Sequence, residues 1–511
     1  MTGPASSAPF DPGELHPETA LLAKIPIGYA RRHLLLPCRT PAGDVVLLSG
    51  GKPEAREAID EMRFLAGSTR VVCAPENEVL ARIDAAYERA HSPENEIVEG
   101  LPGEWDLDPT AAIEETRDLL ESPDEAPVIR FVHAVLFRAI RERSSDIHFE
   151  PYEKELVVRN RVDGILYPMI TAPRKWHAPA VSRVKVMAGL DIAERRLPQD
   201  GRIKIRLGGR EIDIRVSTVP TSFGERAVLR LLDKSNLELD MTKLGFETAQ
   251  LVDFNDSIHR PFGMILVTGP TGSGKTTTLY SALVDLNKVA DNICTAEDPV
   301  EYNFAGINQV QTKEEIGLTF AAALRSFLRQ DPDIIMVGEI RDYETAEIAV
   351  KAALTGHLVL STLHTNDAPS TVTRLLNMGI EPFLVSSSLN LIVAQRLARR
   401  VCMKCREEIK VPPKALADAG MKPERIRLAK PAKGKGCEDC SGTGFRGRVA
   451  LYEVMPIKEE IKDLVLRGGS ALDLQREAVR LGMKTLRQSG LTKLEEGVTT
   501  LEEVLRVTAP D

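Results

Sequence analysis

The stretch Met264–Leu279, MILVTGPTGSGKTTTL, joins a short apolar run to a glycine-rich loop. Residues 264–267 are all apolar, which is typical of a strand buried in a parallel sheet. The next eight residues fit G-x-x-x-x-G-K-[ST] at every fixed position; they are Gly269, Pro270, Thr271, Gly272, Ser273, Gly274, Lys275 and Thr276. Glycines let a backbone wrap closely around a phosphate, which then faces backbone N–H groups and a helix N-terminus.

This pattern predicts a site for ATP in which residues 269–276 and the adjoining Thr277 bind the nucleotide. Lys275 is expected to reach the β- and γ-phosphates, and the Thr276 hydroxyl is expected to coordinate Mg²⁺. The alternative is a glycine-rich turn without a ligand. Such a turn would not require Gly-Lys-Thr directly after an apolar strand, so we favour the nucleotide site.

Acidic residues follow two further apolar runs. The segment DNICTAEDPVEY predicts a strand that ends at Glu297, followed by Asp298 and Glu301, and acids at the carboxyl end of a strand lie where α/β sheets hold ligands. The strand predicted over 334–337 is followed by Gly338 and Glu339. Glycine occupies the position of the usual Walker B aspartate, so Glu339 is expected to polarise the attacking water. Mg²⁺ is then left to Thr276, phosphate oxygens and water.

Two histidines flank the strand predicted in GHLVLSTLHTN. His357 precedes it and His364 follows it. A single histidine is more often structural, but two beside one strand of a nucleotide domain favour a role at the γ-phosphate or at a subunit boundary.

Four of the seven cysteines form two C-x-x-C pairs, Cys402 with Cys405 and Cys437 with Cys440. Two such pairs predict a closed tetrahedral Zn²⁺ site, which is structural rather than catalytic. An iron–sulfur cluster is the alternative, and no redox context in the sequence supports it. Each of the other three cysteines sits alone beside apolar residues and is expected to be a small buried side chain.

Length and composition limit the remaining possibilities. A chain of 511 residues predicts three or four domains, and its formal net charge of −8 gives no electrostatic footprint for nucleic acid. No apolar stretch approaches the ~18 residues of a membrane span. The N-terminal MTGPASSAPFDPGE lacks the regions of a secretory signal. We therefore expect a cytoplasmic protein that does not bind nucleic acid.

Composition divides the chain into five parts. Residues 1–20 are rich in proline, serine and glycine and are expected to be disordered. Residues 21–90 predict a small α/β module. Residues 91–126 contain twelve acids, a single arginine and four prolines, which predicts an acidic linker with at most one short helix. A second module follows at 127–241, and the nucleotide domain occupies 242–511.

The pattern also predicts individual elements. In the second module, VIRFVHAVLFRAIRE predicts a helix and SSDIHFEPYEKELVVRNRVDGILYP two strands. The alternation in GRIKIRLGGREIDIRVSTVPT predicts a hairpin around its Gly-Gly pair. In the nucleotide domain, EPFLVSSSLNLIVAQRLARRV is expected to be a helix with a basic C-terminal end. Residues 457–507 are expected to form several short amphipathic helices.

Arginines are dense in the hairpin region: Arg202, Arg206, Arg210, Arg215, Arg226 and Arg230. One interpretation is that they pair with neighbouring acids such as Glu211, Asp213 or Glu225. The other is that a guanidinium reaches the phosphates of a neighbouring subunit.

Taken together, these residues resemble the type II/IV secretion ATPases, most closely the GspE subgroup that powers type II secretion. The resemblance covers about residues 130–511. It is carried by SSDIHFEP, RVDG, LPQDGRI, DIRVSTVPT, GERAVLRLLD, the phosphate loop, TAEDPVE, LRQDPDIIMVGEIRD, TGHLVLSTLHTN, AQRLARR and the tetracysteine loop. The segment IPIGYARRHLLLP also resembles the opening of that subgroup's first domain.

The resemblance implies an α/β protein in which a small N-terminal α/β docking domain and a PAS-like α+β domain precede a RecA-like P-loop ATPase domain carrying the zinc loop 402–440. It implies a homo-hexamer in which Arg215 and Arg230 cross to the nucleotide as arginine fingers. Glu297, with Asp298 and Glu301, would be the family's Asp box, and His357 and His364 its His box. Gly338 is normal for this family.

The resemblance also implies partners and a location. The N-terminal domain would dock on the cytoplasmic domain of a GspL-like inner-membrane protein, and ATP hydrolysis would act on a GspF-like platform protein to raise a pseudopilus. The ATPase would thus be attached peripherally to the inner membrane. A pilus-extension ATPase is the alternative, since such enzymes share the tetracysteine loop. A nucleic-acid translocase is disfavoured by the net charge, and an inactive scaffold by the presence of both Lys275 and Glu339.

Overall fold

The computed structural model describes residues 15–22, 25, 27–40, 43–51, 58, 59, 62, 70–90, 127–207, 210–233 and 239–509. The chain divides into two compact units, Met1–Ser235 and Asn236–Asp511. The predicted acidic linker, residues 91–126, lies outside the described residues. Each unit is described by itself below.

The first part of unit 1 is a small α/β module with a four-stranded sheet in the order β1-β2-β3-β4. Its strands are β1 (His16–Pro17), β2 (Leu35–Arg39), β3 (Val45–Ser49) and β4 (Val71–Cys73). Its helices are α1 (Thr19–Leu22), α2 (Ile27–His33) and α4 (Glu76–Ala90), and their apolar residues share one core with the strands. Within the stretch expected to be disordered, residues 16 and 17 form a strand and α1 begins at Thr19, while residues 1–14 lie outside the described part.

The second part of unit 1 contains an antiparallel sheet in the order β7-β6-β5-β10-β9-β8. The strands are β5 (Asp146–Pro151), β6 (Glu155–Val162), β7 (Ile165–Pro173), β8 (Gln199–Leu207), β9 (Arg210–Thr221) and β10 (Gly224–Asp233). Helices α6 (Pro127–Arg141) and α7 (His177–Met187) bury their apolar side chains in one core with this sheet. The helix and the hairpin predicted from the sequence are therefore confirmed.

The prediction of two strands in the segment that ends in GILYP was wrong, because the structure has three. The polypeptide turns at Asp163 and Gly164, whose φ angles of 48° and 87° are both positive. Asp-Gly is the residue pair that a tight hairpin turn of this kind favours, so Ile165 starts a new strand paired with β6.

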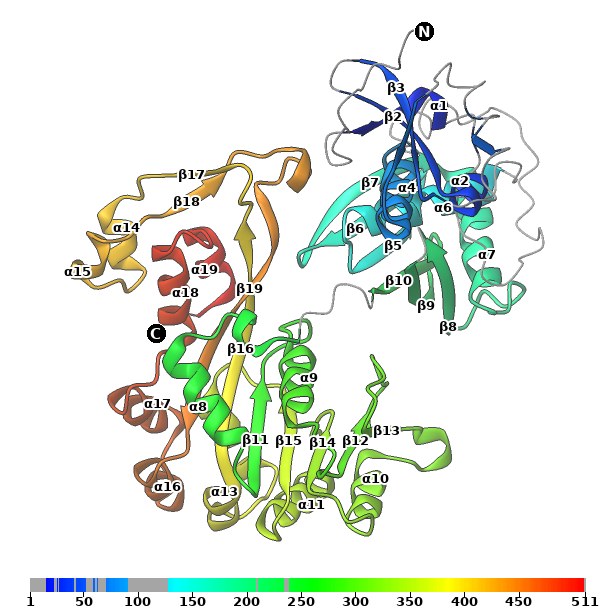
Figure 1. Ribbon diagram of the computed structural model, residues 1–511. Helices are drawn as coiled ribbons and strands as arrows, with labels where there is room; N and C mark the ends of the chain where they lie inside the picture. The colour runs from blue at the N-terminus through cyan, green and yellow to red at the C-terminus, as the bar shows by residue number, and fades with distance from the viewer. Residues whose placement is uncertain are drawn as a thin grey trace, which may run out of the picture. The chain divides into compact units, whose positions relative to one another are not determined.

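Unit 2 is built on a seven-stranded sheet in the order β13-β12-β14-β15-β11-β16-β19 (Figure 1). Its strands are β11 (Gly263–Thr268), β12 (Ile293–Glu297), β13 (Ile307–Gln311), β14 (Ile334–Val337), β15 (Leu358–Leu363), β16 (Leu389–Val401) and β19 (Phe445–Pro456). All neighbours run parallel except β16 and β19. The strands predicted before Glu297, Glu339 and His364 are thus confirmed, and their carboxyl ends share one edge of the sheet.

Helices cover both faces of this sheet. On one face lie α8 (Thr248–Ile258) and α9 (Lys275–Leu286), which share a core with Ile265 and Val267. On the other lie α10 (Phe320–Phe327), α11 (Tyr343–Leu354), α12 (Ala368–Asn377) and α13 (Pro382–Ser388), which share a core with Met264 and Leu266. Burial of alternate residues on two faces explains why β11 is apolar throughout.

The helix predicted over 381–401 was only partly right. A short helix, α13, ends at Ser388, and the rest of the segment is the thirteen-residue strand β16. β16 lies between β11 and β19, so its apolar residues are buried on both faces of the sheet. A run that is apolar on all sides does not distinguish a buried strand from a buried helix, and the sheet decided the outcome.

After the sheet, the chain forms four short helices, as the sequence predicts: α16 (Glu459–Leu466), α17 (Ala471–Arg480), α18 (Leu486–Glu495) and α19 (Leu501–Val507). Between β16 and β19 lies an insertion with a two-stranded sheet of β17 (Arg406–Glu408) and β18 (Ala432–Gly434) and the helices α14 (Pro413–Asp418) and α15 (Pro423–Ile426).

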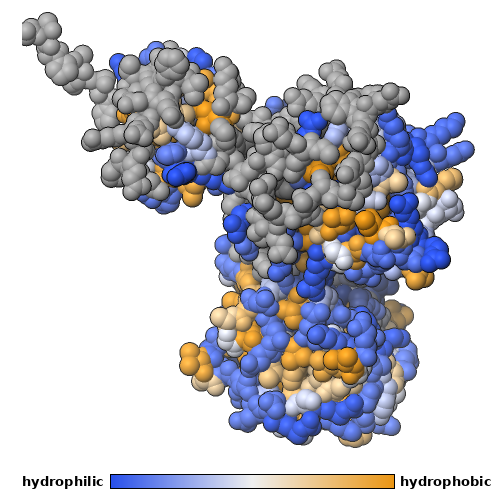
Figure 2. All heavy atoms as spheres, turned by 90° about the vertical axis from the view of Figure 1, so that its right-hand side faces the viewer, coloured by the Kyte–Doolittle hydropathy of each residue, from blue (hydrophilic) through white to orange (hydrophobic). Residues whose placement is uncertain are grey.

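Among the described residues, no helix has the length and apolar character needed to cross a membrane. Figure 2 shows the side of unit 2 on which the edge strand β13 lies, where apolar side chains gather among polar ones. Ile316, shortly after β13, is 74% exposed.

Candidate active site

The phosphate loop connects the carboxyl end of β11 to the start of α9. Gly274 caps α9 with a φ of 89°, which a side chain would strain. A Cβ at Gly269 would lie 2.5 Å from the Gln395 carbonyl oxygen, so this position tolerates only glycine. The loop therefore owes its shape to glycines at both ends, as the sequence pattern predicts.

Three polar side chains of this loop are placed for an anion and its metal. Lys275 donates through Nζ to the carbonyl oxygens of Gly269 (2.7 Å) and Pro270 (3.3 Å), and burial lowers its pKa to about 8. Ser273 has a buried Oγ that makes no hydrogen bond to any residue the structure describes. Thr276 is exposed in the first turn of α9. A half-buried ammonium and an unpaired buried hydroxyl fit a site completed by a phosphate.

Glu339, after β14, lies between two basic side chains. Its Oε2 is 3.0 Å from Nε2 of His364, and its Oε1 accepts a hydrogen bond from Arg341, which also lies 4.0 Å from Asp298. Burial raises the pKa of Glu339, but the bonds from Arg341 and His364 outweigh it, so the pKa is lowered. The carboxylate is thus held charged, and its charge opposes the pKa shift of Lys275.

The glycine at the Walker B position has a steric explanation. A Cβ at Gly338 would lie 3.3 Å from the Ala296 carbonyl oxygen and 3.4 Å from the Phe320 ring. A side chain at this position would crowd both neighbours, which favours glycine there, and Glu339 is the acid that follows β14.

Glu297 is buried, and its carboxylate is occupied by hydrogen bonds. It accepts from Tyr280 on α9, from Thr295 Oγ1 (2.6 Å) and from Gln309 Nε2 (2.9 Å) on β13. Burial and the bond to Glu297 raise the pKa of Tyr280 far above its ordinary value, so it stays a donor. These contacts connect α9 to β12 and β13. Glu297 is therefore placed to hold these elements in position.

The two histidines lie at opposite ends of β15. His364 follows its carboxyl end, beside Glu339. His357 precedes it, bonds to the Ala352 carbonyl oxygen through Nδ1 (3.0 Å), and accepts through its own carbonyl from the amide of Gly263 at the start of β11. A strand of this length separates them by roughly 20 Å. Within one chain, the structure thus brings His364 to the phosphate-loop edge and leaves His357 at the other edge.

The two arginines expected to act as fingers are direct cross-strand neighbours. Arg215 on β9 pairs with Arg230 on β10, and this row continues through Arg202 on one side and through Asp146 and Arg161 on the other. Directly opposed residues project from the same face of a sheet. One face of unit 1 therefore carries a row of four arginines and one acid.

Two of the acids suggested as partners of the fingers, Glu211 and Glu225, pair with other residues. Arg230 donates through Nε to Asp146 (3.1 Å), and its side chain is 55% exposed. Glu225 is engaged by the buried Lys185, and Glu211 by Arg206. The exposed fraction leaves the Arg230 guanidinium accessible to a further anion.

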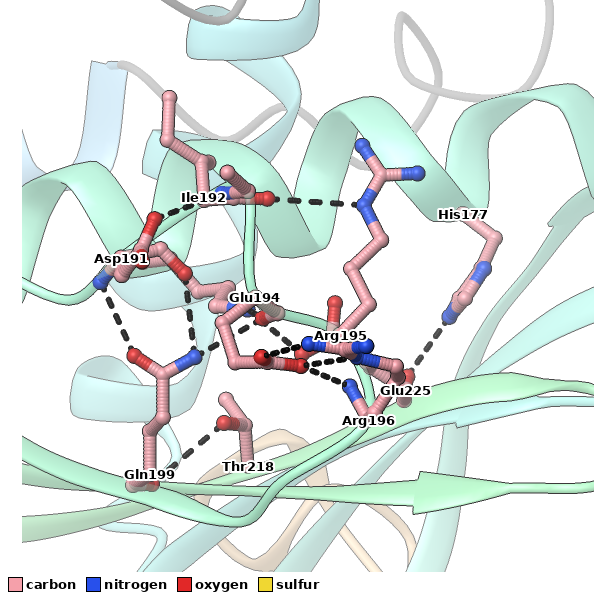
Figure 3. Close-up of polar contacts among 11 residues, drawn as sticks. His177, Asp191, Ile192, Glu194, Arg195, Arg196, Gln199, Thr218 and Glu225 are labelled. Carbon is pink, nitrogen blue, oxygen red and sulfur yellow. Dashed lines mark hydrogen bonds and ion pairs between the residues drawn. The ribbon is translucent and has the colours of Figure 1, made fainter.

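The strands that carry this row are braced by the loop before β8 (Figure 3). Gln199 accepts from the Asp191 amide (2.9 Å) and donates to the carbonyl oxygens of Asp191 and Glu194 (3.0 Å each). Lys185 reaches both the Glu194 carbonyl and the Glu225 carboxylate at 2.6 Å. The loop is thereby anchored to β8 and β10, which favours a rigid platform for the arginines.

The four cysteines of the C-x-x-C pairs converge in the insertion between β16 and β19. Among the described residues they form a cluster whose Sγ atoms all lie within 4.8 Å of one another. Sγ–Sγ distances are 3.8 Å for Cys402–Cys437 and 3.9 Å for Cys405–Cys440. Four thiolates about 2.3 Å from one Zn²⁺ would be about 3.8 Å apart. The donor set therefore fits a tetrahedral zinc ion.

We predict one zinc ion per chain in the purified protein. Cys405→Ser should lose most of the zinc, because three thiolates no longer close the tetrahedral shell. Elemental analysis measures this, and Cys73→Ser, at an exposed cysteine outside the cluster, is the matched control. Nucleotide affinity should persist, since the cluster lies in the insertion between β16 and β19 and none of its cysteines belongs to the phosphate loop. Iron with sulfide in place of zinc would contradict this assignment.

Comparison with known proteins decides the family. The family model described as "Type II/IV secretion system protein" matches residues 121–506, and the model of the MshEN domain matches residues 6–93. The chain belongs to the type II/IV secretion system protein family. The predicted resemblance is thereby confirmed, and the chain is an ATPase.

Relatives within this family have two different names. The chain is 56% identical over 500 residues to the type IV pilus assembly ATPase PilB of Myxococcus xanthus, covering 97% of this chain and 88% of that protein. It is 50% identical over 435 residues to the type II secretion system protein E of Pseudomonas aeruginosa, covering 84% and 85%. The family ATPases thus include both pilus and type II secretion proteins.

Solved structures of similar fold support the architecture. The Legionella pneumophila ATPase DotB aligns with a TM-score of 0.56 at 21% identity, covering 77% of this chain and 99% of that one. The pilus retraction motor PilT with bound ADP aligns with a TM-score of 0.50 at 28% identity, covering 74% and 96%. The predicted RecA-like α/β fold class is confirmed.

Two basic side chains of the site were missed by the sequence interpretation. Arg341 follows Glu339 by two residues in GEIRD, and that proximity was an available signal. Arg396 contacts the phosphate loop from β16, a segment that was expected to be helical. No local sequence pattern could have predicted that residue 396 lies beside residue 269.

Proposed function

We propose that this family ATPase hydrolyses ATP at residues 269–277 to drive the assembly of a pilin-type filament. The observation that carries the proposal is that Lys275 and the charged Glu339 lie at one edge of the sheet, within electrostatic range of each other. Phosphoryl transfer needs an oriented water and stabilised charge rather than covalent participation of the protein.

The roles of the residues follow from this geometry. Lys275 and the loop amides bind the phosphates, and Glu339, oriented by His364 and Arg341, accepts a hydrogen bond from the attacking water. Thr276 offers a hydroxyl to Mg²⁺, which supplies charge neutralisation at the phosphates when it is bound. The four cysteines hold a structural Zn²⁺.

We further propose that the protein works as a homo-hexamer in which Arg215 and Arg230 complete the site of a neighbouring subunit. The row of arginines on one face of unit 1 supports subunit contacts. The N-terminal module would dock on a GspL-like inner-membrane protein or its pilus counterpart. A GspF-like platform protein would receive the mechanical work, so the ATPase would be cytoplasmic and attached to the inner membrane through partners.

Two filaments are candidates for the product of this work. The pseudopilus of type II secretion is the candidate predicted from the sequence, and the 50% identity to protein E of Pseudomonas aeruginosa supports it. A type IV pilus is the second candidate. The higher identity of 56% to PilB of Myxococcus xanthus, over 97% of this chain, favours the pilus.

Complementation in the source organism tests these candidates. A strain that lacks the gene should lose surface pili if the filament is a pilus, or retain exoproteins in the periplasm if the filament is a pseudopilus. The wild-type gene should restore the lost phenotype, and a gene encoding Lys275→Ala should not. Electron microscopy and fractionation of exported proteins measure the two outcomes. Normal pili together with normal export in the deletion strain would contradict the proposal.

A further inference from the structure

A basic side chain lies against the first glycine of the phosphate loop. β16 pairs in parallel with β11 up to Thr268 and Ala394, and it extends beyond the end of β11 (Figure 1). Arg396 is two residues further along β16 and therefore lies beside the start of the phosphate loop. A Cβ at Gly269 would lie 3.1 Å from Nη1 of Arg396.

Within the described part of the chain, the hydrogen bonds of Arg396 all go to neutral oxygens. Nη2 donates to the carbonyl and to Oδ1 of Asn366 (3.1 Å each), and Nη1 donates to the carbonyl of Gln395 (3.1 Å). A guanidinium has five N–H donors, so at least two remain for another acceptor. Burial lowers the pKa of Arg396, opposed by the charges of Asp367 and Glu453. A half-buried cation without a hydrogen-bonded acid is a place where an anion is stabilised.

Arg396 and Lys275 act on each other electrostatically. The positive charge of Arg396 contributes to lowering the pKa of Lys275, so the two cations repel each other across the start of the loop. An anion bound between them would replace this repulsion with two attractions. The ATP site proposed above supplies such an anion.

We propose that Arg396 binds the terminal phosphate of ATP from within the same chain, and that Asn366 positions its guanidinium. This inference rests on the proposed nucleotide site at residues 269–277. It adds a cation in cis to the arginines expected from a neighbouring subunit. It also gives the site a means of distinguishing ATP from ADP.

The contacts of Asn366 link this cation to the catalytic acid. Asn366 lies two residues after His364, whose ring contacts Glu339. Between them, Thr365 is anchored by its hydroxyl to Thr268 at the end of β11 (2.7 Å). A phosphate bound to Arg396 would therefore act, through Asn366, on the segment whose His364 orients Glu339.

Nucleotide binding by the full-length protein tests the inference. Calorimetric titration with a non-hydrolysable ATP analogue and with ADP compares the wild type with Arg396→Gln. The variant should bind the ATP analogue about 10- to 100-fold more weakly, the loss expected for one hydrogen bond between charged groups, and ADP less than about 3-fold more weakly. Arg396→Lys retains the charge without the planar fork, so its affinity for the ATP analogue should lie between those of the wild type and Arg396→Gln.

Two further variants separate binding from a structural role. Arg400→Gln, at an exposed arginine of the same strand, should bind both nucleotides as the wild type does. Asn366→Ala should reproduce part of the selective loss for the ATP analogue. Equal weakening of both nucleotides in Arg396→Gln and Arg396→Lys would overturn the inference in favour of a structural role, and so would unchanged binding of both. Lack of nucleotide binding by the wild type would instead contradict the proposed site.

Discussion

The variant Glu339→Gln is expected to bind ATP with nearly unchanged affinity and to hydrolyse it about 10²- to 10⁴-fold more slowly. Gln keeps the size of the side chain and one acceptor oxygen, but its amide nitrogen cannot accept as the second carboxylate oxygen does, and it loses the negative charge that orients and polarises water. In the structure, that charge is maintained by Arg341 and His364, which together lower the pKa of Glu339. Steady-state ATPase assays and nucleotide titration measure the two effects separately.

Lys275→Ala is the comparison for this variant. Removing the ammonium should weaken binding and hydrolysis together, because its charge acts on the phosphates in the ground state as well as in the transition state. Glu339→Gln should therefore differ from Lys275→Ala in its affinity for ATP. Wild-type turnover in purified Glu339→Gln would disprove the assignment of the water-orienting residue.

Replacing Arg215 or Arg230 by alanine is expected to lower ATP hydrolysis by about 10³- to 10⁵-fold, the range known for arginine fingers. The phosphate loop contains no arginine, so charge that develops in the transition state must be neutralised from elsewhere. Both residues belong to the arginine row of unit 1, and the Arg230 side chain is 55% exposed. Binding of ATP and the thermal unfolding midpoint should change little. Arg206→Ala, on the adjacent strand β8, is the matched control.

A mixing experiment distinguishes fingers that act between subunits from fingers that act within one chain. An Arg230→Ala chain and a Lys275→Ala chain are each expected to be inactive alone. In mixed rings, some interfaces combine an intact phosphate loop with an intact arginine, so activity should partly return. If the fingers act within one chain, no mixture can build a complete site. Failure to recover turnover at any ratio, with mixed rings demonstrated, would exclude the role between subunits.

Local sequence patterns were sufficient where backbone geometry alone sets the structure. The phosphate loop needs glycine at 269 and at 274 because of a close approach and a positive φ, so the pattern of residue types already implies its conformation. The apolar runs before Glu339 and His364 are strands because runs this short and apolar, rich in β-branched residues, fit a sheet covered on both faces. The spacing of the cysteines likewise anticipated their convergence on one point.

Contacts between distant segments were decided only by the tertiary structure. β16 is a strand because the sheet offers it two neighbours, and that pairing brings Arg396 to Gly269. The length and direction of β15 separate His357 from His364, which the sequence alone could group as one pair. Cross-strand register aligns Arg230 with Arg215 and with Asp146, an acid that neither interpretation of the sequence named. Pairing and register depend on burial summed over a whole sheet, and no short stretch of residues contains that information.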